Sequence, residues 1–246
     1  RGGLELPSLG LGTWMMGMDP SNRADEVAAL QLGMDLGLNL IDTAENYGDG
    51  GSEKVVGEAI KGRRGEVVLV TKVHPTKATR QGTFDYCERS LELMGTDHID
   101  LYLLHDEPVH PLEETLESLE RLKVDGKILH YGVSNFPLQA MQDCEKLDLG
   151  SNVACNQLRY ALTHRALERE ILPWCEEQDI SLMAYSPVGV GKLNLAAELE
   201  EVARRHDVSP WCAAIAFTMR HPKVVSIPKA SNPAHVRDNA KALTVK

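Results

Sequence analysis

Short apolar runs recur along the chain, and each ends on a glycine or on a residue with a polar side chain. Examples are LNLID, VVLVTK and LYLLH, which end on Asp42, Lys72 and His105. Successive endings lie 23 to 33 residues apart, except for a last gap of 44 residues, and this spacing is typical of one strand followed by one helix. The eight predicted strand ends are Gly12, Asp42, Lys72, His105, Ser134, Gln157, Tyr185 and Lys229.

The segments between these runs repeat apolar residues at intervals of three and four, which indicates amphipathic helices. The clearest of them are residues 23–36, 111–125, 165–178 and 195–206. Strands that alternate with helices predict an α/β fold with a parallel sheet. Near-continuous apolar strands, such as LYLL, suit a sheet that is buried on both faces.

The length of the chain agrees with a (β/α)8 TIM barrel, which typically occupies ~250 residues. The chain has 246 residues and no linker or low-complexity stretch, so we expect residues 1–246 to form a single barrel domain. The 44-residue gap before Lys229 contains two helical stretches separated by Ser209 and Pro210. This gap predicts an extra helix in the seventh connection.

Composition narrows the possible partners and the cellular setting. Lys plus Arg is 26 and Asp plus Glu is 36, so the formal charge is −10, which argues against nucleic acid and anionic membranes as partners. No apolar run approaches the ~18 residues of a membrane helix, and the opening RGGLELP does not resemble a signal peptide. The five cysteines form no CxxC pair, which favours core thiols, a reducing cytoplasmic setting and no metal site. A monomer is the default expectation.

The polar endings can combine into an active site, because catalytic groups of such barrels lie at the carboxyl ends of the strands. Tyr47 follows Asp42 by five positions. It should share one mouth with Lys72 and His105, where the mouth is the opening of the barrel at the carboxyl ends of its strands. A phenol has an ordinary pKa near ~10. An adjacent ammonium would lower the pKa of Tyr47, and a carboxylate would hold that ammonium in place. Such a set suits protonation of a carbonyl oxygen, with His105 as hydrogen-bond donor, while a cofactor supplies hydride.

Seven motifs, in order, resemble the aldo-keto reductases: IDTAENYG, VLVTK, LYLLH, GVSNF, NQLRY, AYSP and IPKASNPAHVRDN. The resemblance spans nearly the whole chain and looks closest to a bacterial branch of small-aldehyde reductases that includes methylglyoxal and diketogluconate reductases. It implies NADPH-dependent reduction of small aldehydes or ketones, with Tyr47 as the general acid. The implied catalytic tetrad is Asp42, Tyr47, Lys72 and His105.

The resemblance also implies a nicotinamide cofactor site. Ser134, Asn135 and Gln157 would surround the carboxamide, and Tyr185 would stack on the ring. The remaining implied contacts run from the pyrophosphate to the adenosine end and comprise Ser186, Val188, Gly189, Lys229, Ala230, Ser231, His235, Asp238 and Asn239.

The adenosine end departs from the pattern of animal members of the family. His235 stands where an arginine is usual, and Ala230 stands where a serine is expected. Histidine cannot match the permanent bidentate charge of arginine near neutral pH, although Arg237 could compensate. Lys229 favours NADPH, and use of NADH stays open.

The implied substrate pocket contains Trp14 and, directly after His105, Asp106 in place of a frequent tryptophan. Asp106 and Glu107 make the mouth acidic, so we expect small neutral polar aldehydes or dicarbonyls and weak use of anionic substrates unless a basic residue intervenes. An N-terminal hairpin and a C-terminal substrate loop of the relatives are expected to be absent or incomplete. The physiological substrate is left open.

Three other functions compete with this interpretation. A barrel protein that binds nicotinamide nucleotide without turnover would use the same fold, but the complete tetrad argues against it. A Rossmann dinucleotide-binding site is excluded, because the GxGxxG motif that begins at Gly10 has Met15 in place of its third glycine. A metal site of His74, His105 and Asp42 would leave Tyr47 and the GVSNF motif unexplained.

Overall fold

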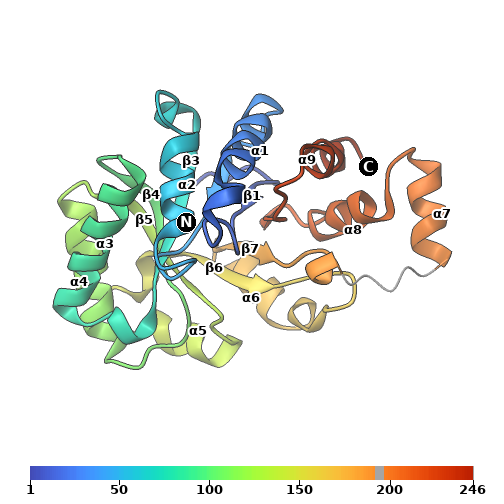
Figure 1. The fold of residues 1–246 in the computed structure, drawn as a ribbon. Helices are drawn as coiled ribbons and strands as arrows, with labels where there is room; N and C mark the ends of the chain where they lie inside the picture. The colour runs from blue at the N-terminus through green and yellow to red at the C-terminus, as the bar shows by residue number, and fades with distance from the viewer. Residues whose placement is uncertain (192–196, 246) are drawn as a thin grey trace.

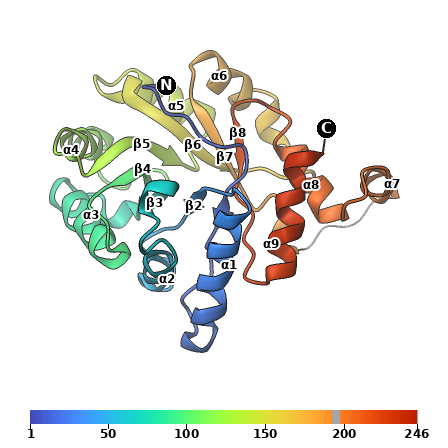
Figure 2. The ribbon, with the colours of Figure 1, turned by 90° about the horizontal axis from the view of Figure 1, so that it is seen from above.

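A computed structural model describes residues 1–191 and 197–245 of the chain (Figure 1). Eight parallel strands form one sheet in the order β1 to β8, so every strand lies beside its neighbour in sequence. Seen from above in Figure 2, the strands surround the centre and the helices lie outside them. The strands are β1 (Leu11–Gly12), β2 (Leu40–Asp42), β3 (Val68–Val73), β4 (Ile99–Leu104), β5 (Ile128–Ser134), β6 (Val153–Arg159), β7 (Ser181–Tyr185) and β8 (Val224–Ser226).

Hydrogen bonds also join the first strand to the last. Gly10 N donates to Ser226 O at 2.8 Å, and Gly12 N donates to Pro228 O at 3.0 Å. Gly12 permits this close approach, because a Cβ at this position would lie 2.7 Å from Ile227 O. The sheet therefore curls until its two edges meet.

Alternation along the strands determines which residues point to the centre of the sheet. One buried cluster fills this centre and comprises Leu40, Val70, Leu101, Leu103, Cys155, Met183, Val225 and Ile227. Two positions beyond Leu40, Val70 and Leu103 stand Asp42, Lys72 and His105. Residues two positions apart in a strand point to the same side of the sheet. The side chains of Asp42, Lys72 and His105 therefore lie next to the central core, at the carboxyl ends of their strands.

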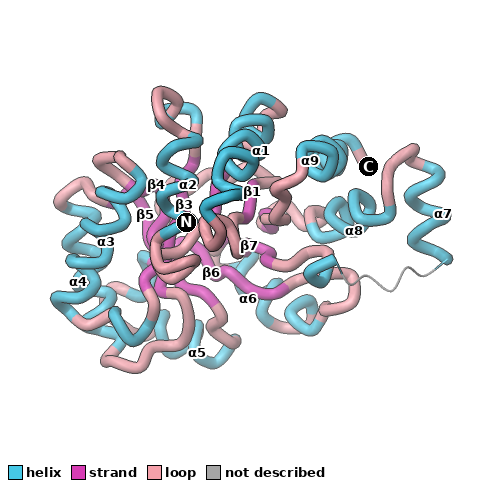
Figure 3. The backbone as a smooth tube through the Cα atoms, viewed as in Figure 1, coloured by secondary structure: helices cyan, strands magenta, loops and turns pink. Residues whose placement is uncertain are grey.

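The helices form an outer layer around the sheet (Figure 3), and a larger apolar cluster fills the space between the two layers. The α-helices are α1 (Arg23–Asp35), α2 (Gly51–Ala59), α3 (Arg80–Met94), α4 (Leu112–Val124), α5 (Leu138–Glu145), α6 (Ile171–Glu177), α7 (Ala197–Arg205), α8 (Pro210–Thr218) and α9 (Pro233–Ala240). Within the described ranges, no helix is long and apolar enough to cross a bilayer.

Two helices, α7 and α8, lie between β7 and β8. Ser209 caps α8, since its side chain accepts a hydrogen bond from Cys212 N at 3.0 Å. Leu199 and Ala203 of α7 pack against Ala213 and Ala214 of α8, and α7 lies at the outer edge of the molecule (Figure 1). The first two residues of the predicted helix 195–206 lie outside the described residues.

Candidate active site

Lys72 and Asp42 form a buried ion pair at the carboxyl ends of β3 and β2. Lys72 Nζ donates to Asp42 Oδ1 at 2.8 Å and to Thr43 O at 2.7 Å, and the Lys72 side chain has no exposed surface. Burial alone would lower the pKa of Lys72, but the Asp42 carboxylate and the Tyr47 phenol outweigh it, and the net shift is upward. Lys72 is therefore held as a charged ammonium.

Tyr47 lies in the turn after β2, close to this ammonium. Lys72 Nζ is 5.2 Å from the centroid of the Tyr47 ring. Burial raises the pKa of Tyr47 above its ordinary value, and Lys72 opposes that rise without reversing it. The expectation of a lowered pKa is thus wrong in its net direction, because removal of the phenol from water outweighs the nearby charge. The phenol stays protonated, which is the form that a proton donor needs.

His105 completes the group from the position after β4. Its ring packs edge-on against Tyr47, with centroids 5.6 Å apart and planes inclined by 69°. Burial, together with the charge of Lys72, lowers the pKa of His105 to about 3. His105 Nδ1 is buried and has no hydrogen-bond partner among the described residues. The imidazole is therefore neutral and can still make a hydrogen bond.

The four predicted tetrad residues are thus brought to one mouth, and Gln157 joins them. Gln157 Nε2 donates to Asp42 Oδ1 at 2.7 Å, the same oxygen that accepts from Lys72. This contact connects the predicted carboxamide residues to the ion pair. It also places a second hydrogen-bond donor on the buried carboxylate.

The other predicted carboxamide residues form a connected network beside Gln157. Ser134 Oγ donates to Gln157 O at 3.1 Å, and Asn135 Nδ2 donates to His105 O at 3.2 Å. Asn135 has a φ of 61°, a conformation that asparagine adopts more readily than most residues. Tyr185 OH donates to Asn135 Oδ1 at 3.0 Å, which fixes the position of a half-buried aromatic ring at the mouth.

The predicted pyrophosphate residues follow β7 directly. Ser186 and Gly189 have φ values of 52° and 58°, and Val188 packs partly buried against the core. Left-handed residues in a loop can orient neighbouring backbone amide groups toward an anion. The chain continues into residues 192–196, which lie outside the described ranges.

The predicted adenosine residues lie on the other side of the first strand, after β8 and on α9. Lys229 is exposed and donates from Nζ to Ser231 Oγ at 3.1 Å. His235 and Arg237 are exposed, and Asn239 is half-buried. Ala230 is buried against Ala29 and Val236, so a larger residue would have little room there.

Asp238 has a structural contact that the sequence pattern does not reveal. Its carboxylate accepts a hydrogen bond from Ser209 Oγ, the residue that caps α8. Asp238 thus connects α9 to the start of α8, in addition to any contact with a nucleotide.

The predicted pocket residues Trp14 and Asp106 are both exposed near this mouth, and 48% of the Trp14 surface is accessible. Trp14 precedes Met15, which has a φ of 67°. Sequence reasoning misses one further charged residue at the mouth, Arg159, at the end of β6. The signal was present, since Arg159 stands two positions beyond Gln157 in the same strand.

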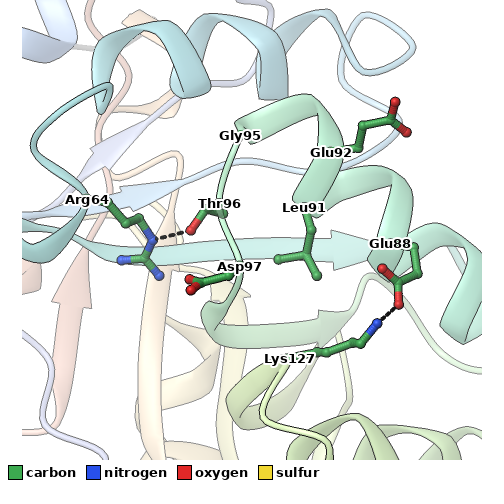
Figure 4. A pocket seen from close by; sticks show the side chains of 8 residues that line it. All are labelled: Arg64, Glu88, Leu91, Glu92, Gly95, Thr96, Asp97 and Lys127. Atoms are coloured by element: carbon green, nitrogen blue, oxygen red, sulfur yellow. Dashed lines mark hydrogen bonds and ion pairs between the residues drawn. The ribbon is translucent and has the colours of Figure 1, made fainter.

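A hollow of about 860 Å³ lies at the opposite end of the sheet, between the end of α3 and the residues that precede β3, β4 and β5 (Figure 4). Its lining mixes both signs of charge, and Lys127 pairs with Glu88 across it. Arg64, another lining residue, is held by Asp100 at 2.7 Å and Thr96 at 2.9 Å. Arg64, Glu88 and Lys127 are therefore already engaged with partners of their own, and we assign no function to this hollow.

Comparisons with known proteins agree with this geometry. The sequence profile of the Aldo/keto reductase family matches residues 8–246. The chain belongs to the aldo/keto reductase family. It is 46% identical to the methylglyoxal reductase YeaE of Escherichia coli over 249 residues, which cover 99% of this chain and 88% of that protein.

Two solved structures of family members from Klebsiella pneumoniae are also similar. One, in complex with NADP and acetate, is 43% identical, with a TM-score of 0.94 over 97% of this chain and 86% of that one. The other, in complex with NADPH, is 42% identical, with a TM-score of 0.95 over 98% of this chain and 86% of that one. The aldo/keto reductase fold therefore accounts for the curled parallel sheet and its surrounding helices.

Proposed function

We propose that the protein reduces small aldehydes or ketones to alcohols with NADPH and that Tyr47 is the general acid. The observation that carries this proposal is the convergence of the Tyr47 phenol, the Lys72 ammonium and the His105 imidazole beside the Tyr185 ring. Membership of the aldo/keto reductase family and the similarity to a methylglyoxal reductase support it.

The residues present fit a nicotinamide cofactor. The Tyr185 ring is anchored by Asn135 and leaves an aromatic face at the mouth, while Ser134 and Gln157 lie beside it. Lys229 is exposed on the side where the 2′-phosphate of NADPH would lie, and Ser186 with Gly189 would follow the pyrophosphate. The NADP and NADPH complexes of the two Klebsiella relatives support this assignment.

When bound, NADPH supplies hydride to the carbonyl carbon. The neutral His105 imidazole orients the carbonyl oxygen by a hydrogen bond, and the Tyr47 hydroxyl gives its proton to that oxygen as charge develops there. Lys72 stabilises the phenolate that remains, and Asp42 keeps Lys72 charged and in place. Each of these roles needs the protonation state that the structure favours.

The proposal also includes the domain organisation, the oligomeric state and the cellular compartment. Residues 1–246 would act as one barrel domain, with α7 as the extra helix, since α7 packs on α8 through Leu199 and Ala203. A monomer with a small carbonyl substrate is the simplest state. The five free, buried cysteines support a reducing compartment such as the cytoplasm.

The test is the oxidation of NADPH, followed by its absorbance, with methylglyoxal, glyceraldehyde and 4-nitrobenzaldehyde as substrates. The alcohol product is identified by chromatography. Turnover with NADPH and an alcohol formed in equal amount would support the proposal. Tight NADPH binding with no turnover on any of these carbonyls would instead support the non-catalytic nucleotide-binding function.

A further inference from the structure

Arg159 stands on the wall of the same mouth as the tetrad. It ends β6, where Cys155 lies in the central core and Gln157 reaches Asp42. Arg159 is two residues beyond Gln157, so its side chain points to the same side of the sheet and lies closer to solvent. Its Cα partner on β7 is Tyr185, the ring proposed to lie against the nicotinamide.

The Arg159 side chain is exposed and has no partner in the part of the chain that the structure describes. Neither a hydrogen bond nor an ion pair joins it to residues 1–191 or 197–245. Most other arginines of the molecule are paired with carboxylates, as Arg64 is with Asp100. A guanidinium offers five N–H donors in a planar fork that suits carboxylate and phosphate groups.

Arg159 and Asp106 place opposite charges on two sides of the mouth. Asp106 is exposed on the loop after β4, where its Oδ1 accepts from Glu107 N at 2.9 Å. Burial raises the pKa of the Tyr185 hydroxyl, while Arg159 lowers it and Asp106 raises it, so both charges act on the same ring. The side formed by β6 is therefore positive, and the side after β4 is negative.

We propose that Arg159 is a specificity-determining residue that binds an anionic group, a carboxylate or a phosphate, on a small carbonyl substrate. This inference rests on the proposed reductase function and specifies its substrate class. Arg159 is the basic residue that offsets Asp106 and Glu107, whose charges alone would exclude such substrates. The anionic group would lie toward β6, with the carbonyl oxygen directed to Tyr47 and His105.

The experiment compares matched pairs of substrates that differ in charge: 4-carboxybenzaldehyde with 4-nitrobenzaldehyde, and glyceraldehyde 3-phosphate with glyceraldehyde. The measured quantity is the ratio of kcat/KM for the anionic substrate to that for its neutral match. Arg159→Gln should lower this ratio about tenfold, mainly through KM, since a charge-assisted hydrogen bond is lost. Asp106→Asn should raise the ratio, because a like charge is removed.

Arg121→Gln is the control, since it removes the same charge from the far end of α4, where Arg121 pairs with Asp125. It should leave the ratio as in the wild type. Ionic strength gives a second readout: as the Debye length falls from about 30 Å to about 10 Å, the ratio should fall in the wild type and much less in Arg159→Gln.

A fall confined to the carboxylate pair or to the phosphate pair would support the proposal and identify the group that is bound. A ratio within about twofold of the wild type in folded Arg159→Gln, or an equal fall in Arg121→Gln, would overturn it. These outcomes all require turnover. Failure of the reductase function itself would appear differently, as no reduction of any of the four carbonyls by the wild-type protein.

Discussion

The two ends of the proposed cofactor site are constructed in different ways. At the carboxyl ends of β2 and β3, Asp42 and Lys72 are buried and joined by a 2.8 Å hydrogen bond, and Gln157 adds a third partner. On the adenosine side, Lys229 and His235 are exposed and belong to the segment after β8 and to α9. At the strand end the sheet holds the side chains in place, and at the helix end, formed by the segment after β8 and by α9, the side chains are exposed to solvent.

This difference shows which side chains of the site have a set position before any ligand binds. Strand register and burial leave Lys72 a single position, because an unpaired buried ammonium would be very unfavourable. An exposed lysine such as Lys229 keeps its rotamer freedom until an anion arrives. The four predictions below test whether chemistry and stability depend on the strand end and whether cofactor preference depends on the helix end.

The largest effect is expected for Tyr47→Phe. Loss of the phenolic proton should reduce kcat for aldehyde reduction about a thousandfold, within the usual range for general acid catalysis. The ring remains, so the dissociation constant for NADPH, measured by fluorescence titration, should stay close to wild type. Weak NADPH binding with normal turnover would reverse the assignment of Tyr47.

Lys72→Met tests the stability of the strand end. Removing the ammonium leaves the Asp42 carboxylate buried with Gln157 as its remaining side-chain partner among the described residues, which should lower the free energy of unfolding by about 3–5 kcal/mol. Urea denaturation measures this. The matched change at the other end, Lys229→Met, should alter stability by less than about 0.5 kcal/mol, since Lys229 is exposed. Equal losses would remove the contrast between the two ends.

His105 gives the strand end a dependence on pH. The pKa of His105 is about 3 in the folded protein and 6.5 ordinarily, so between these values the unfolded chain binds a proton that the folded protein does not. Stability is therefore lost as pH falls from 6.5 toward about 3, by up to about 1.4 kcal/mol per pH unit from this group. His105→Asn should flatten that part of the urea-midpoint profile. Parallel profiles for the two proteins would argue against a buried neutral imidazole.

Lys229→Met should have the smallest effect on reduction and a selective one. Its KM for NADPH should rise about tenfold, while its KM for NADH should change little, because only NADPH carries a 2′-phosphate. Steady-state kinetics with both cofactors measures the two values. Equal changes would mean that Lys229 is not the residue that faces the phosphate.

Much of the strand end could be predicted from the sequence, because burial on both faces produces apolar runs with clear endings. Strands β1, β2, β5 and β7 end at the predicted residues. β8 ends earlier, at Ser226, and Pro228, which has no N–H to donate, follows two positions later.

Other features depend on the folded environment. The predicted helix 165–178 is a 3-10 turn (Ala166–Glu168) followed by α6, which begins at Ile171 and so keeps Pro173 in its first turn. The direction of the Tyr47 pKa shift depends on the degree of burial, which sequence spacing does not give. The contact of Asp238 with Ser209 joins segments that no sequence pattern relates.

The contact of Gly10 and Gly12 with Ser226 and Pro228 has a consequence for synthesis on the ribosome. Strand β1 must wait for its second partner, β8, which is made more than 200 residues later. Until then both margins of the nascent sheet display unpaired amides and carbonyls, a state that invites pairing with other chains. Chaperone demand during translation should therefore be highest just before β8 emerges.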